Sequence, residues 1–123
     1  MLARDEATRS LGIEISAVGA GRATAAMTVT PSMVNGHAVA HGGYVFLLAD
    51  TAFAFACNTH GADVVAAGAE VSFLAPARVG DRLTAVAAER VRAGRSGIYD
   101  VTVRTVGGDV VAEFRGRSRE LRR

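Results

Sequence analysis

The chain has a single cysteine, Cys57, among its 123 residues, so no disulfide can form within it. This absence fits a reducing compartment, where disulfides are rare. Residues 1–6 contain no apolar segment behind a basic start, so we expect no secretory signal peptide. Together these two absences predict a cytoplasmic location.

The chain also lacks an uninterrupted apolar run long enough to cross a membrane. Its main apolar segment, residues 41–58, is broken by the carboxylate of Asp50, and a charge at the centre of a bilayer is costly. We therefore predict no membrane span. Cys57 lies in this apolar segment, so we expect its thiol to be buried and inert rather than catalytic.

Aromatic residues make up only 6% of the chain, and the formal net charge is only +2. Five arginines lie in the last nine residues with no aromatic residue between them, which argues against nucleic-acid binding. This basic segment is either a solvated strand face and tail or an anion-binding surface. The spacing of cysteine and histidine matches no metal site, so we expect no metal ion.

The most prominent feature that is present is the segment 41–58. It contains neither lysine nor arginine, and nearly every position is apolar or small. The pattern predicts one helix of about five turns, roughly 27 Å long. A helix that is hydrophobic on all sides must be buried on all sides.

Alternation of apolar and polar residues predicts strands on both sides of this helix. A short helix over residues 3–10 and two strands at residues 13–18 and 22–30 precede it. A loop over residues 32–40 leads into the long helix. After the helix we expect four strands, one within 63–74 and three at 82–92, 98–106 and 110–119. A loop at 93–97 and a hairpin turn at 107–108 connect the last three strands. In the strand 22–30 the residues expected to share one face are Ala25, Met27 and Val29, and in the strand 98–106 they are Tyr99, Val101 and Val103. In the strand 82–92 the residues expected to share one face are Leu83, Ala85, Ala87 and Val91.

The long helix is the only element available to cover the dry face of an antiparallel sheet. One helix wrapped by a curved antiparallel sheet is the hot-dog fold, of the α+β class. Residues 1–123 form a single domain without internal repeats. A single sheet leaves part of such a helix uncovered, so we expect a second copy to complete its burial in a homodimer.

Asp50 is the only carboxylate in the predicted helix. An ionised carboxylate in a protein interior needs hydrogen bonds, a cation or a raised pKa. The helix offers no cation three or four residues away. Either backbone amides or an arginine from elsewhere satisfy Asp50, or it is a base or nucleophile in a partly buried cleft.

His41, Gly42 and Gly43 begin the predicted helix. The free amides and the positive dipole end of a helix N-terminus suit an oxyanion, and glycine lets a ligand approach the backbone closely. Asp50 follows Gly42 by eight residues, about 12 Å along the helix axis and about 80° around it. The two groups therefore cannot touch one atom within one subunit, but they can meet if the helices of two subunits lie side by side.

Several polar residues near the helix start have more than one possible role. His41 is a helix cap, a hydrogen-bond donor or a general base, and Asn35 is a turn former or a polar residue of the site. His37 and His60 lie in predicted loops, where we expect them at the surface.

At these residues the chain resembles the phenylacetyl-CoA thioesterase family, the PaaI type of hot-dog acyl-CoA thioesterases. The segments that carry the resemblance are Val34-Asn35-Gly36-His37, His41-Gly42-Gly43 and Leu48-Ala49-Asp50-Thr51-Ala52-Phe53-Ala54. Phe73-Leu74-Ala75-Pro76-Ala77 with Gly80-Asp81 is similar to a strand and turn of the same family. The likeness extends over nearly the whole chain.

The resemblance implies hydrolysis of an acyl-CoA thioester, with an aryl-acetyl or hydroxylated phenylacetyl acyl group. Asp50 would activate water or attack the thioester itself, and the amide of Gly42 from the other subunit would stabilise the oxyanion. Asn35 would orient the water or the carbonyl, His41 would support the loop, and Thr51 would hydrogen-bond Asp50 or the substrate.

The resemblance also implies contacts to coenzyme A from glycine-rich and basic positions. For these contacts we expect Gly43, Arg90, Arg95, Ser96 and Gly97, although a solvated turn is the alternative for Arg95. Coenzyme A is part of the substrate, so no separate cofactor is expected. The family further implies a homodimer that assembles to a homotetramer.

Two other functions remain open on the sequence. A hot-dog hydratase or dehydratase pairs a carboxylate with a histidine that acts on the acyl chain, and His41 is not obviously placed for that task. A non-catalytic acyl-CoA-binding module would not need Asp50 together with Gly42, so these residues favour hydrolysis.

Overall fold

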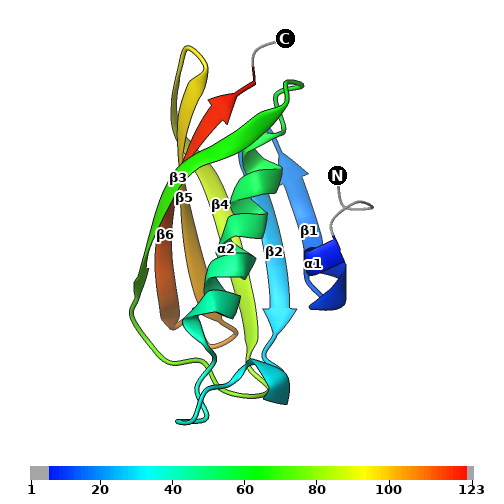
Figure 1. Ribbon diagram of the computed structural model, residues 1–123, viewed down its shortest axis with the longest axis vertical. Coiled ribbons are helices and arrows are strands. Elements are labelled where there is room, and N and C mark those ends of the chain that lie inside the picture. Colours follow the sequence, from blue (N-terminus) through cyan, green and yellow to red (C-terminus); the bar gives the residue numbers. More distant parts are fainter. Residues whose placement is uncertain (1–5, 122–123) are drawn as a thin grey trace.

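The computed structural model describes residues 6–121 and forms one curved antiparallel sheet around a long helix (Figure 1). The elements are α1 (Glu6–Ser10), β1 (Glu14–Gly19), β2 (Arg22–Thr28), the 3₁₀ turn η2 (Pro31–Met33), α2 (Gly42–Cys57), β3 (Val64–Phe73), β4 (Arg82–Ala93), β5 (Ser96–Thr105) and β6 (Val110–Glu120). The strand order is β1-β2-β4-β5-β6-β3, with every neighbouring pair antiparallel. The hot-dog fold predicted from the sequence is confirmed.

The predicted helix 41–58 is confirmed, with each end one residue shorter because His41 and Asn58 are the capping residues of α2. The side that faces the sheet is buried, whereas Phe46, Leu47 and Asp50 are only partly buried. One chain therefore leaves one side of α2 open. No helix among residues 6–121 is long and apolar enough to cross a membrane.

Small residues on the inner face of the sheet let α2 approach it closely. Ala25, Ala85 and Ala87 are fully buried beneath the helix. The ring of Phe53 packs among the strands, with its centroid 5.6 Å from that of Tyr99 and 5.8 Å from that of Phe114. These aromatic contacts fix the height of α2 above the sheet.

The inner faces of β2 and β5 follow the predicted alternation. The residues buried there are Ala25, Met27, Tyr99, Val101 and Val103, and Val29, which directly follows β2, is buried as well. The prediction that Val91 shares the inner face of β4 is wrong. The register of β4 against β5 shifts between Glu89 and Val91, so Arg90 is the extra residue of a β-bulge, and Val91 turns outward with 47% of its surface exposed.

Two predicted loops are more regular than expected. β4 runs to Ala93 and β5 begins at Ser96, so the predicted loop 93–97 is a two-residue turn in which Gly94 has a φ of 60°. The predicted loop 32–40 is entered through the 3₁₀ turn η2, which spans Pro31–Met33 and so includes the first two residues of that loop. The predicted helix 3–10 corresponds to Glu6–Ser10, and its first three residues lie outside the described residues.

Candidate functional site

The N-terminus of α2 is held in place by His41. Its backbone N–H donates to the Met33 carbonyl at 2.7 Å, and its Nδ1 accepts a hydrogen bond from the Gly43 N–H at 3.2 Å. His41 is thus the N-cap of α2, one of the roles expected for it. Because Nδ1 is the acceptor, a neutral imidazole ring carries its proton on Nε2.

Gly42 is the first residue of α2, and its N–H has no acceptor among the described residues. The first amides of a helix and its dipole attract negative charge. The structure therefore places a free donor where the sequence predicts the oxyanion to bind.

Gly42 also adjoins an open apolar hollow of about 470 Å³. The ring of Phe73 borders this hollow and points at Gly42, because a β-carbon on Gly42 would lie 2.8 Å from Cζ of Phe73. Only a glycine allows the ring to come this close. The end of β3 and the start of α2 therefore form one continuous surface.

Asp50 lies in the middle of α2 and is partly buried. It shares one side of the helix with Gly43 and Leu47, which precede it by seven and three residues. α2 is continuous from Gly42 to Asp50, so helix geometry separates the two by about 12 Å along the axis. One chain cannot bring the carboxylate and the Gly42 amide to the same atom.

Asn35 shapes the loop that leads into α2. Its Oδ1 accepts hydrogen bonds from the N–H groups of His37 and Val39 at 2.9 and 3.4 Å, and its own N–H donates to the Val39 carbonyl at 2.9 Å. Ala38 in this loop has a φ of 60°, a left-handed conformation that is energetically unfavourable for residues other than glycine. Of the two roles expected for Asn35, the turn former is thus present. Its part in orienting water or substrate stays a prediction.

Thr51 is 4% exposed, and its hydroxyl donates to the Leu47 carbonyl at 2.8 Å. This hydrogen bond runs one turn back along the helix, as buried threonines commonly arrange it. The hydroxyl proton is therefore donated within α2, and the hydrogen bond to Asp50 or the substrate that the resemblance implies for Thr51 stays a prediction.

The residues expected to contact coenzyme A lie at opposite ends of α2. Gly43 is in its first turn, whereas Arg90, Arg95 and Ser96 belong to the β4–β5 hairpin beside its C-terminal end (Figure 1). Ser96 Oγ accepts a hydrogen bond from Arg119 at 2.9 Å. The structure does not bring the hairpin and Gly43 together within one chain.

Gly97 is buried inside the same hairpin. A β-carbon there would lie 2.7 Å from Ser118 Oγ and 3.0 Å from Cε1 of Tyr99. Close packing alone therefore requires a glycine at this position.

A polar cluster that the sequence analysis missed lies at the C-terminal end of α2. Oε1 of Glu89 accepts a hydrogen bond from the Tyr99 hydroxyl at 3.0 Å and pairs with Nε2 of His60 at 2.7 Å. Burial alone would raise the pKa of Glu89, but the bonds from His60 and Tyr99 outweigh it and hold that pKa below its ordinary value. The sequence carried one signal for this cluster, because Glu89 continues the spacing of two residues that places Leu83, Ala85 and Ala87 on the inner face of β4.

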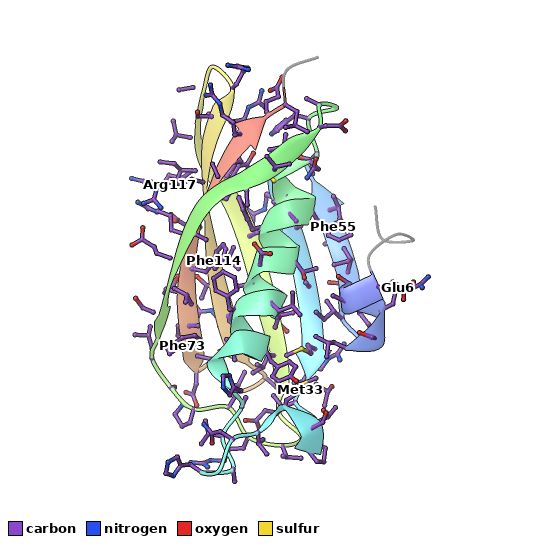
Figure 2. The ribbon with its side chains drawn as sticks, in the orientation of Figure 1. Glu6, Met33, Phe55, Phe73, Phe114 and Arg117 are labelled. Atoms are coloured by element: carbon purple, nitrogen blue, oxygen red, sulfur yellow. The ribbon has the colours of Figure 1, made fainter. Side chains whose placement is uncertain are left out.

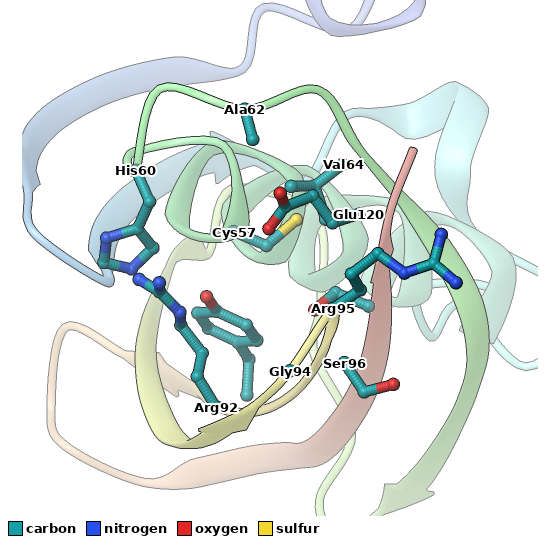
Figure 3. Close-up of a pocket in the computed structure, with 11 residues that line it drawn as sticks. Cys57, His60, Ala62, Val64, Arg92, Gly94, Arg95, Ser96 and Glu120 are labelled. Carbon is teal, nitrogen blue, oxygen red and sulfur yellow. The ribbon is translucent and has the colours of Figure 1, made fainter. Parts of the chain in front are cut away.

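Beside this cluster lies a small cavity of about 20 Å³ (Figure 3). His60, Arg92, Arg95 and Cys57 are among its lining residues. The space suffices for about one water molecule and is too small for a substrate group. The expected burial of Cys57 is confirmed, and burial raises the pKa of its thiol to about 11.

The described part of the chain contains no group of three or more His, Cys, Asp and Glu residues that could hold a metal ion. The candidate site offers the N–H of Gly42, the carboxylate of Asp50 and an apolar hollow between α2 and β3.

Comparison with known proteins shows clear similarity. The sequence profile of the thioesterase superfamily matches residues 37–112. Acyl-coenzyme A thioesterase PaaI of Escherichia coli strain K12 is 43% identical over 121 residues, which are 98% of this chain and 86% of that protein. A putative esterase of Deinococcus radiodurans is 43% identical over 108 residues, which are 86% of this chain and 73% of that protein.

Solved structures agree with these similarities. The structure of E. coli PaaI, a protein of the phenylacetic acid degradation operon, is 43% identical and matches with a TM-score of 0.97, covering 99% of this chain and 88% of its own. A mutant form of the phenylacetic acid degradation protein PaaI from Thermus thermophilus is 34% identical and matches with a TM-score of 0.91. That match covers 95% of this chain and 100% of the Thermus chain.

Proposed function

Because this chain belongs to the thioesterase superfamily, we propose that it hydrolyses acyl-coenzyme A thioesters to a free acid and coenzyme A. The observation that carries the proposal is the near-full-length likeness to E. coli PaaI, a named acyl-coenzyme A thioesterase. Since two similar structures come from phenylacetic acid degradation proteins, we take aryl-acetyl-CoA, with or without ring hydroxyls, as the substrate class.

The proposed reaction begins with the thioester carbonyl oxygen at the free amide of Gly42. Asp50 takes a proton from water, the water oxygen forms a bond to the carbonyl carbon, and the Gly42 N–H stabilises the resulting oxyanion. The oxyanion then reforms the carbonyl, the C–S bond breaks, and the coenzyme A thiolate takes the proton from Asp50. In the alternative route, Asp50 attacks the carbonyl carbon, the C–S bond breaks, and the coenzyme A thiolate leaves behind a mixed anhydride with Asp50. Water then hydrolyses this anhydride, which restores the Asp50 carboxylate and releases the acid, and the thiolate takes up the proton that the water gives off.

This mechanism needs two copies of the chain, because Gly42 and Asp50 are too far apart within one helix. The open side of α2 and the edge strand β3, where Val65 is 45% exposed, supply apolar surface for a partner. An unpaired strand edge readily joins another chain. We propose a homodimer in which Asp50 faces Gly42 of the partner subunit, with two dimers forming a homotetramer.

The phosphates of coenzyme A need cations, and we propose Arg90 and Arg95 of the β4–β5 hairpin for this role. Neither side chain forms an ion pair with another described residue, in contrast to Arg115, which binds Asp100. In this proposal Arg90→Gln and Arg95→Gln raise KM for a CoA thioester but leave an N-acetylcysteamine thioester, which has no phosphate, unaffected. Equal effects on both substrates would contradict the assignment.

The activity is tested by measuring the loss of the thioester bond and the release of thiol from a panel of acyl-CoAs. We expect Asp50→Asn and Asp50→Ala to lower kcat by about 10²–10⁴ with the fold intact by circular dichroism. Unchanged turnover in both variants would overturn the role of Asp50. Hydration of an enoyl-CoA without thiol release would identify a hydratase, and binding without any turnover would identify a binding module.

The Gly42 amide is tested by comparing two substitutions at the same position. Gly42→Ala adds a β-carbon but keeps the N–H, whereas Gly42→Pro adds carbon and removes the N–H. Proline is well tolerated at the first position of a helix, and His41 already has the extended backbone, with a ψ of 134°, that precedes a proline. We expect proline to lower kcat about 10²–10³ further than alanine does; equal losses would exclude the amide as oxyanion donor.

Mixing the variants tests whether the site is shared between subunits. A dimer of one Asp50→Ala chain and one Gly42→Pro chain contains one intact site if the two groups come from different subunits. We expect the mixture to regain activity after dissociation and reassociation. Mixed dimers without activity would refute the shared site while leaving the hydrolase activity itself unaffected.

A further inference from the structure

Phe73 is a large aromatic residue at the end of the edge strand β3, and 54% of its surface is exposed (Figure 2). The next residue, Leu74, is 60% exposed. Both side chains border the apolar hollow beside the start of α2. Two exposed large apolar side chains at the rim of one hollow indicate a binding surface.

The position of the Phe73 ring is set by Gly42. The ring tip comes so near that a β-carbon on Gly42 would lie 2.8, 3.1 and 3.3 Å from Cζ, Cε2 and Cε1 of Phe73. The ring therefore lies directly beside the residue whose amide has no acceptor among the described residues. A carbonyl bound at that amide brings its attached groups into the neighbourhood of the ring.

Every side chain that lines the hollow is apolar. Its residues are Val39, Ala40, Gly42, Val45, Phe73, Leu74, Ala75, Pro76, Ala77 and Val111. The volume of about 470 Å³ lies within the range of small-molecule sites. Since this lining offers no charged or polar side chain, it suits a hydrocarbon or aromatic group and not a phosphate.

We infer that Phe73 is the residue that selects the acyl group: its ring forms the wall of an apolar pocket that begins at the Gly42 amide and receives an aromatic acyl group. This inference rests on the proposed thioesterase function. A phenylacetyl group without ring hydroxyls has no polar group beyond the carbonyl, whereas the pantetheine arm carries two amides that would lose their hydrogen bonds to water in this hollow. An aromatic acyl group also gains ring–ring contact with Phe73.

The test compares Phe73→Leu and Phe73→Ala with Val86→Ala, a large-to-small change at a 37% exposed position of β4 that lies outside the hollow and away from the edge strand. The measured quantity is the ratio of kcat/KM for phenylacetyl-CoA to kcat/KM for hexanoyl-CoA. We expect Phe73→Leu to lower this ratio about five- to tenfold through loss of the ring contact. Phe73→Ala enlarges the pocket and favours a longer aryl chain, and Val86→Ala leaves the ratio unchanged.

A second readout separates this inference from the function on which it rests. Calorimetry with a thioether analogue of phenylacetyl-CoA, which cannot be hydrolysed, measures binding alone, and light scattering follows the oligomeric state. Weaker analogue binding in Phe73→Leu without turnover in the wild type would support the pocket and overturn the hydrolase. Equal changes for both acyl groups, or dissociation of the oligomer by Phe73→Leu, would overturn the inference while the thioesterase activity stands.

Discussion

The ring of Phe53 lies directly against the backbone of Gly116, so that a β-carbon at Gly116 would be 2.8 Å from three carbons of the ring. Phe53 belongs to α2 and Gly116 to the buried face of β6. The absence of a side chain at this one position lets the ring settle between Tyr99 and Phe114. Because the core is closely packed, the helix and the sheet depend on this glycine.

We predict that Gly116→Ala destabilises the protein by about 1–3 kcal/mol, because the added methyl group overpacks the core. Gly68 on β3 is the matched control, since a β-carbon there meets nothing within 4 Å. Urea unfolding measures the free energy of each variant. Gly68→Ala is expected to stay within about 0.5 kcal/mol of the wild type. A Gly116→Ala variant as stable as the control would contradict the packing argument.

The Glu89 cluster predicts a dependence of stability on pH. The pKa of Glu89 is lower in the folded protein than its ordinary value of 4.5. Its contribution to stability is therefore fully present above about pH 4.5 and is lost as the pH falls towards the folded-state pKa. We expect unfolding free energies measured in urea at about pH 6 and about pH 3.5 to differ less in Glu89→Gln than in the wild type. The same difference in both proteins would remove Glu89 from the explanation of acid sensitivity.

Tyr99→Phe tests one bond of the same cluster. The substitution removes the hydroxyl that donates to Glu89 at 3.0 Å and leaves the aromatic ring in the core. We expect a loss of about 1 kcal/mol at neutral pH, measured by thermal or urea unfolding. Combined with Glu89→Ala, which removes the acceptor, Tyr99→Phe should cost less than it does alone, because the two residues share the bond. Costs that simply add would contradict a stabilising bond between Tyr99 and Glu89.

His41 can be tested as a cap by exchanging it for a better and a worse capping residue. His41→Ala removes the acceptor of the Gly43 N–H and should lower stability by about 1 kcal/mol, whereas His41→Asn should restore it. Unfolding and turnover are measured on the same samples. If His41 acts only as the cap, Asn also restores kcat; a stable Asn variant with low kcat would instead assign His41 to the chemistry.

The thiol of Cys57 should be unreactive in the native protein. A pKa of about 11 leaves roughly one thiol in 3,000 ionised at about pH 7.5, and only 3% of the residue is exposed. We expect no labelling by a thiol-specific reagent under native conditions and one label per chain in urea. Rapid labelling of the folded protein would contradict the burial of this end of α2.

The sequence alone predicts the order of the elements, the long helix, the inner faces of β2 and β5 and the resemblance to the family, and these predictions are confirmed. Each depends on a local signal. Helix and strand periods repeat within a few residues, and the group His41-Gly42-Gly43 needs only its own segment to start a helix. The separation of Gly42 from Asp50 is likewise fixed by the geometry of a single helix.

Tertiary structure decided the features that join residues distant in the chain. The bulge at Arg90 turns Val91 outward, and Glu89 pairs with His60, which precedes it by 29 residues in the chain. Phe73 meets Gly42 only because β3 ends beside the start of α2 (Figure 1). Such contacts depend on strand register and on the packing of α2 against the sheet, and no local period encodes either of them.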